Sequence, residues 1–94
     1  MAIARVVSFE DVSSDRMTEL QQRMDEGEPP EGMPPVEVLV LHDAGGGRAL
    51  VIQVFESEDD YRRGEEVFAA MPATDTPGRR TTVSRYEVAA RMTS

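Results

Sequence analysis

Two apolar segments that lie close together constrain the fold of this chain more than any other feature. Residues 36–42 and 49–55 are rich in Val, Leu and Ile, and a glycine-rich stretch separates them. This pattern predicts an antiparallel β-hairpin. When His42 is placed opposite Ala49, the predicted hairpin is apolar on both faces. A sheet with one face in water alternates apolar and polar residues, so both faces of this sheet need a cover.

The rest of the sequence predicts two further strands and two helices. Strands are expected at residues 2–9 and 81–90, where Val, Ile and Tyr recur. Serine is a typical N-cap, and glycine and proline are typical helix ends. The helices are therefore expected to run from Ser13 to Gly27 and from Ser57 to the residue before Pro72. The resulting order is β-α-β-β-α-β.

This order most simply gives an α+β fold, a ferredoxin-like sandwich with one four-stranded antiparallel sheet and both helices on one face. We expect a single domain over residues 1–94, because the chain is too short for two. The usual strand order of this sandwich, 4-1-3-2, places residues 36–42 at an edge. An apolar edge strand and an uncovered apolar face favour association. We therefore expect a homodimer whose two sheets pack face to face into an α+β barrel.

Composition excludes several classes of function. The net charge is −8, and all ten basic residues are arginines scattered along the chain, which argues against nucleic-acid binding. The absence of Cys and the single His argue against a disulfide framework, a thiol nucleophile and a metal site, and no cofactor is expected. The apolar stretches are too short to cross a membrane. The first residues lack an export leader, so a cytoplasmic location is expected.

Residues 49–71, ALVIQVFESEDDYRRGEEVFAAM, resemble the third strand and second helix of the dimeric α+β-barrel superfamily. Within that superfamily, the segment is most similar to the antibiotic biosynthesis monooxygenase-like group. The opening AIARVV and the closing RYEVAA resemble the first and last strands of that group, so the likeness spans most of the chain through short motifs. It implies the ferredoxin-like subunit and, for an enzyme, a cofactor-free monooxygenase-like activity.

The chain departs from the residues that this group uses for catalysis. Cofactor-free oxygenases and haem-degrading members carry an acidic residue and a Trp two positions apart at the end of the third strand, and a His on the second helix. The matching positions here are Gln53, Phe55 and Gly64. Haem-degrading members also use an Asn in the first strand, and this sequence contains neither Asn nor Trp. These departures argue against haem degradation and, less strongly, against quinone-forming oxygenation.

Gly64 marks a candidate ligand site, because it lies on the expected buried stripe of the second helix between Tyr61 and Phe68. A glycine inside a helix costs about 1 kcal/mol relative to alanine, so a compensating gain is expected. Either the helix approaches the sheet closely there, or the missing side chain leaves a gap for a small ligand. In the second case Phe55 would flank the gap and Gln53 would supply its polar contact. A small aromatic or apolar metabolite suits such a pocket.

Two residues are candidates for catalysis. Histidine is the side chain most often used as a general base at physiological pH, and His42 lies at an expected strand end, where it could take that role. Tyr86 lies on the last strand and could reach a ligand, while its neighbour Arg85 points to the opposite face. Each of these three residues has a purely structural alternative: an exposed position for His42, and packing or an ion pair for Tyr86 and Arg85.

The leading hypothesis is that the protein binds a small apolar or aromatic metabolite in a cleft between helices and sheet. If the protein is an enzyme, it would also oxidise or isomerise this metabolite without a metal. The alternative is a non-catalytic dimeric accessory or binding domain whose cleft is filled by its own side chains. An open cavity beside Gly64 would favour the first hypothesis, and a closed core there would favour the second.

Overall fold

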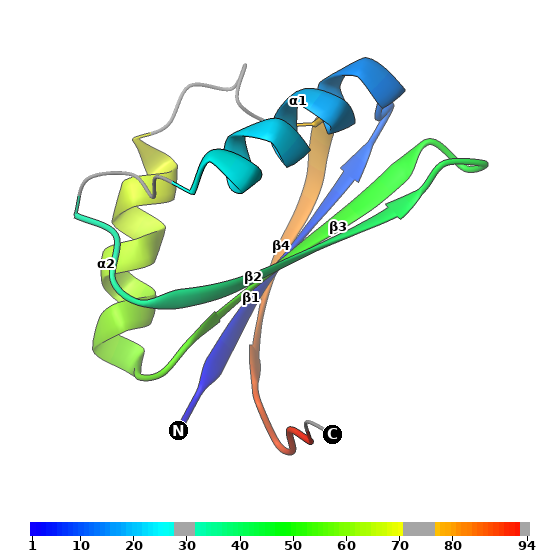
Figure 1. Cartoon of the computed structure of the whole chain (residues 1–94). Coiled ribbons are helices and arrows are strands. Elements are labelled where there is room, and N and C mark those ends of the chain that lie inside the picture. Colours follow the sequence, from blue (N-terminus) through cyan, green and yellow to red (C-terminus); the bar gives the residue numbers. More distant parts are fainter. Residues whose placement is uncertain (28–31, 71–76, 93–94) are drawn as a thin grey trace.

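The computed structural model describes residues 1–27, 32–70 and 77–92 (Figure 1). The elements follow in the order β1 (Ile3–Glu10), α1 (Ser14–Glu26), β2 (Val36–Asp43), β3 (Arg48–Phe55), α2 (Glu58–Ala69) and β4 (Arg79–Glu87). The predicted order and the ferredoxin-like fold class are confirmed. The expected helix end before Pro72 lies outside the described residues.

The strands form one antiparallel sheet in the order β2-β3-β1-β4, which is the predicted order read from the other edge. His42 pairs with Ala49, which is the register considered for the hairpin from the sequence. The range predicted for the last strand was shifted, since β4 runs from Arg79 to Glu87. The Arg79 guanidinium forms ion pairs with Glu10 and Asp11 at 3.0 and 3.1 Å, which holds the polar start of β4 against β1.

Both helices begin at the predicted serines. The Ser13 Oγ accepts a hydrogen bond from the backbone N–H of Arg16 at 3.2 Å, and the Ser57 Oγ accepts one from that of Asp60 at 3.2 Å. These bonds satisfy N–H groups that have no partner inside the helix. Gly27 ends α1 in the left-handed conformation, with φ of 75°, which glycine adopts without steric cost.

Both helices cover the same face of the sheet (Figure 1). Under α1, Met17 joins a buried cluster on β1 and β3 formed by Val7, Phe9, Ala49 and Val51. Under α2, Tyr61 packs with Ile3 and Phe55 in a second buried cluster. The residues that the helices cover alternate along each strand, so they lie on one side of the pleat.

The opposite face of the sheet, called here the open face, carries large apolar side chains in contact with solvent. Those that are more than one-third exposed are Leu39, Leu41, Leu50 and Tyr86, at 47%, 48%, 37% and 59%. Leu41 pairs directly with Leu50, and Tyr86 pairs with Ala4, so these residues share one side of the sheet. As predicted, the sheet has more apolar surface than the two helices cover.

After β4 the chain turns back across one end of the sheet. The backbone N–H of Val88 donates to the Ala2 carbonyl at 2.9 Å. The Arg91 guanidinium then lies 3.2 Å from the Glu37 carboxylate and 3.8 Å from that of Glu56. These contacts tie residues 88–91 to the ends of three other strands.

Candidate functional site

The five residues predicted to bind a ligand lie together beneath α2. Gln53 and Phe55 come from β3, and Tyr61, Gly64 and Phe68 come from α2. The rings of Phe55 and Tyr61 meet edge to face, with 5.8 Å between their centroids and an interplanar angle of 82°. Phe68 packs against the same cluster. We call this region the α2 site; its side chains are mainly aromatic.

Gly64 lets α2 approach the sheet closely. A methyl group at this position would collide with the Cε1 and Cζ atoms of the Phe55 ring, and Phe55 is fully buried. The space left by the missing side chain is therefore occupied by Phe55. This is the close approach that was one of the two interpretations of the glycine.

A charged residue lies at the centre of the α2 site. Arg5 of β1 is only 7% exposed, and its Nη1 donates a hydrogen bond to Gln53 Oε1 at 3.0 Å. Its guanidinium also stacks over the Phe68 ring, 4.9 Å from the centroid. The Arg5 Nε is buried without a hydrogen-bond partner. Burial lowers the pKa of Arg5 below the usual arginine value, although the group stays charged.

Sequence reasoning missed Arg5, although a signal was present. Arg5 alternates with Ile3, Val7 and Phe9, and a period of two places all four side chains on the same face of a strand. All four are buried. An arginine in the middle of a buried alternation therefore identifies the polar centre of this site.

Arg85 borders the site from β4, where it pairs with Arg5 across the ladder. Its guanidinium lies 5.0 Å from the Tyr61 ring centroid and donates to Glu58 Oε1 at 3.1 Å. The ion-pair alternative considered for Arg85 is thus present within the chain. Burial is the main reason that the pKa of Tyr61 is raised, with the Glu65 charge adding to the effect.

The two residues considered for catalysis lie elsewhere. His42 is exposed at the hairpin end of β2, opposite Ala49, whereas Phe55 pairs with Val36 at the other end of the hairpin. Six residues of strand separate the two ends, a distance of about 20 Å. Tyr86 lies on the open face, away from α2. The structure therefore does not bring either residue to the five beneath α2.

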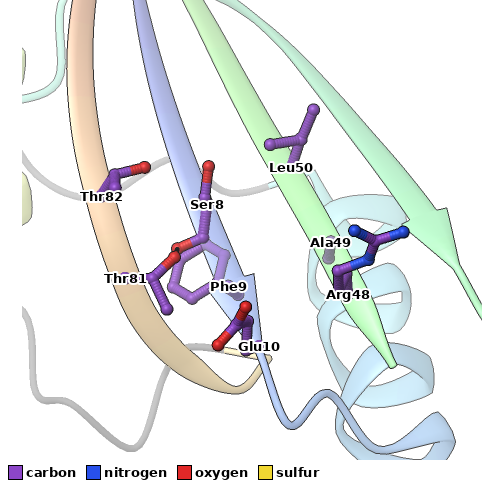
Figure 2. A pocket seen from close by; sticks show the side chains of 8 residues that line it. All are labelled: Ser8, Phe9, Glu10, Arg48, Ala49, Leu50, Thr81 and Thr82. Atoms are coloured by element: carbon purple, nitrogen blue, oxygen red, sulfur yellow. Dashed lines mark hydrogen bonds between the residues drawn. The ribbon is translucent and has the colours of Figure 1, made fainter. Parts of the chain in front are cut away.

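A separate pocket of about 410 Å³ lies at the hairpin end of the sheet (Figure 2). Its lining residues are Ser8, Phe9, Glu10, Arg48, Ala49, Leu50, Thr81 and Thr82. Figure 2 shows Ser8, Leu50 and Thr82 on the near side of the strands and α1 behind them, so the pocket opens on the open face. None of the predicted ligand-binding residues lines it.

The described residues give no support for a metal or a haem group. In residues 1–27, 32–70 and 77–92, no three His, Cys, Asp or Glu side chains are grouped to hold a metal ion. The sequence resemblance matched Gly64 to the helix histidine of haem-degrading proteins, and the Phe55 ring fills the space beside Gly64. The α2 site therefore does not fit a haem ligated from this helix. Neither helix of the described chain is long and apolar enough to cross a membrane.

Comparisons with known proteins show similarity in fold to two solved structures. No protein-family model matches the chain, and no curated protein matches it in sequence. Among solved structures, it is similar to an MhuD variant crystallised with two manganese protoporphyrin IX molecules per active site, at 19% identity and a TM-score of 0.62 over 98% of this chain and 99% of that one. It is also similar to a candidate antibiotic biosynthesis monooxygenase from Bacillus cereus, at 17% identity and a TM-score of 0.52 over 100% of this chain and 97% of that one.

Both likenesses cover nearly the whole of each chain, so they concern the complete fold and not one motif. The resemblance inferred from residues 49–71 is thereby confirmed for the fold. This chain therefore has a ferredoxin-like fold, similar over its whole length to the folds of MhuD and of the Bacillus cereus protein.

Proposed function

We propose that this protein binds a small apolar or aromatic metabolite at the α2 site. The observation that carries the proposal is the hydrogen-bonded pair Arg5 and Gln53, both at least nine-tenths buried within an aromatic lining. Ligand sites typically combine apolar walls with a few well-placed polar groups. A purely structural core at this position would be simpler without a charge, because burying a guanidinium is costly.

Binding is better supported than catalysis. The positions that match the group's catalytic residues hold Gln53, Phe55 and Gly64, and none of these is an acid, a base or a nucleophile at neutral pH. His42 and Tyr86 lie away from the α2 site. The proposal is therefore a binding protein, with cofactor-free oxygenation as a further activity to be tested and not assumed.

The second candidate function is a dimeric accessory domain whose cleft is filled by its own side chains. The Phe55 ring beside Gly64 favours it, because that ring occupies the space a ligand would otherwise use. For a ligand to bind, the Phe55 ring or α2 would have to move. The two candidates therefore differ in whether any small molecule binds the folded protein beneath α2.

A thermal-shift screen of the full chain against phenols, quinones, aromatic acids and haem separates these two functions. A ligand that binds only the folded state raises the melting temperature. We expect stabilisation by small aromatic compounds, and we expect Phe68→Ala to reduce it while Thr82→Ala, on the open face, leaves it unchanged. A screen in which no compound stabilises the protein would favour the accessory domain.

We also propose that two copies of this chain associate through the open face. Three leucines and Tyr86 are exposed there, on the side of the sheet that neither helix covers. A second copy would present the same apolar side chains and bury both sets. Sedimentation equilibrium at micromolar concentration tests this: a mass of two chains supports the dimer, and a single folded chain of 10.4 kDa contradicts it.

A further inference from the structure

We infer that the ligand of the α2 site is an aromatic carboxylate whose charged group pairs with Arg5. This inference rests on the proposed function, and it adds the chemical class of the ligand. Its starting point is that Arg5 is a charged side chain, more than nine-tenths buried, whose hydrogen-bonding capacity is largely unused.

The free edge of the Arg5 guanidinium has the geometry that a carboxylate requires. Arginine has five N–H donors in a planar fork. Among the described residues only Nη1 forms a hydrogen bond, to Gln53 Oε1, while Nε has no partner. The edge formed by Nε and Nη2 lies on the other side of the fork from Nη1. A carboxylate can accept two parallel hydrogen bonds from such an edge.

No carboxylate of the described chain balances the Arg5 charge directly. Glu65 of α2 raises the pKa of Arg5 through its charge and Arg80 lowers it, but no carboxylate lies within ion-pair distance of Arg5 among the described residues. Arg85, the other guanidinium beside Tyr61, is already paired with Glu58 at 3.1 Å. Of these two guanidiniums, Arg5 is therefore the one that has, in the part of the chain that the structure describes, no carboxylate partner for an incoming anion to replace.

The surroundings of Arg5 favour an aromatic body for that anion. The Phe68 ring lies over the guanidinium, and the Phe55 and Tyr61 rings meet edge to face nearby. Aromatic pairs of this kind stabilise beyond the area they bury. The protein as a whole carries a net charge of −8, so its overall field repels anions. Anion binding at this site must therefore come from a local, buried contact.

Benzoate and benzamide test the inference, because they share a ring and differ in charge. Calorimetric titration of the full chain is expected to give benzoate an affinity about tenfold or more higher than that of benzamide, as a charge-assisted hydrogen bond predicts. Arg5→Met is expected to abolish this preference. The control Arg48→Met removes an exposed arginine that pairs with Asp43 on the hairpin, and it should retain the preference.

Two further measurements keep the inference testable even if the Arg5→Met variant does not fold. Arg5→Lys keeps the charge without the fork, so it should weaken benzoate binding more than benzamide binding. In the wild-type protein, raising the salt concentration should change the preference for benzoate less than twofold, because a buried pair is poorly screened. A preference that disappears at high salt would point to surface arginines and overturn the inference.

Failure of the inference and failure of the proposed function are distinguishable. If benzamide and benzoate bind the wild-type protein equally, or if Arg5→Met keeps the preference, the carboxylate assignment is wrong while small-molecule binding stands. If neither probe binds, and the phenols and quinones of the thermal-shift screen also fail, both the inference and the proposed function are wrong.

Discussion

At Gly64, two effects of an added side chain oppose each other. Alanine stabilises a helix by about 1 kcal/mol relative to glycine. The added methyl group, however, would collide with the ring of Phe55, which is fully buried. Overpacking of this kind costs about 1–3 kcal/mol. The collision therefore outweighs the gain in helix propensity.

Gly64→Ala is expected to lower the free energy of unfolding by about 1 kcal/mol, measured by urea denaturation. The double variant Gly64→Ala/Phe55→Leu provides the control, because the smaller leucine makes room for the methyl group. The two substitutions should then be less destabilising together than the sum of their separate effects, by about 0.5 kcal/mol or more. A single variant that is as stable as the wild-type protein would show that Phe55 is not held in place.

Tyr61 is expected to make the free energy of unfolding fall as the pH becomes alkaline. Burial is the largest cause of its raised pKa, so the neutral phenol is favoured in the folded protein. Because the folded pKa lies above the unfolded value of about 10, this stabilisation is complete below that pH and is lost as the pH rises through the folded pKa. Between about pH 9 and 11, the wild-type protein should lose stability relative to Tyr61→Phe in urea denaturation. If the free energy of unfolding changes with pH in the same way for both proteins, the stabilising effect attributed to the buried Tyr61 phenol is wrong.

At the scale of the elements, the sequence predicted the helix ends and turns that are determined by neighbouring residues. The caps Ser13 and Ser57 and the end of α1 at Gly27 were predictable, because each follows from a residue type. The hairpin was predictable from two apolar segments joined by a glycine-rich turn. The start of β4 was not, since Arg79 looks unlike a strand residue. It is held in the ladder by ion pairs with residues nearly seventy positions away, which no local pattern reveals.

In the candidate site, too, the features set by local spacing were predictable and those set by contacts between elements were not. The helical spacing of Tyr61, Gly64 and Phe68 predicted their common face, and the structure places them together. Whether the gap at Gly64 would be empty depended on the ring of Phe55, which comes from another element. Arg5 was overlooked because arginine usually indicates exposure, whereas its alternation with apolar neighbours indicates burial.

The cap of α2 is a testable element of the site, because this helix carries three of its residues. Ser57→Ala removes the acceptor of the Asp60 N–H hydrogen bond and is expected to lower the free energy of unfolding by about 1 kcal/mol. Ser57→Thr keeps a hydroxyl group and should lie close to wild type. Chemical denaturation of both variants measures the difference; equal loss in the two would mean that the hydroxyl group does not act as a cap.

At the scale of the whole molecule, apolar surface is distributed unevenly between the two faces of the sheet. The helices cover one face, while the tail reaches only one end of the other, where Arg91 contacts Glu37 and Glu56. The centre of the open face has no cover among the described residues, and Leu39 and Leu41 are close to half exposed there. Exposed apolar surface of this kind typically marks an interface.

Leu41→Glu is expected to prevent the proposed association, because it would place two carboxylates in an apolar contact between copies. Sedimentation should then give the mass of one chain, and the melting temperature should no longer rise with protein concentration. Ala44→Glu, at the exposed hairpin turn, adds the same charge outside the face and should leave the assembly intact. Dissociation of both variants alike would attribute the effect to net charge and not to the open face.

The contact between Gly64 and Phe55 also provides a spectroscopic probe. An aromatic ring shifts the NMR frequencies of protons above its plane or beside its edge through its ring current. The α-proton of Gly64 that a side chain would replace points at such a ring, and with only seven glycines in the chain its signal can be assigned readily. A molecule that displaces the Phe55 ring would move this signal towards the frequency of an ordinary helical glycine. One resonance can therefore report whether the space beneath α2 opens.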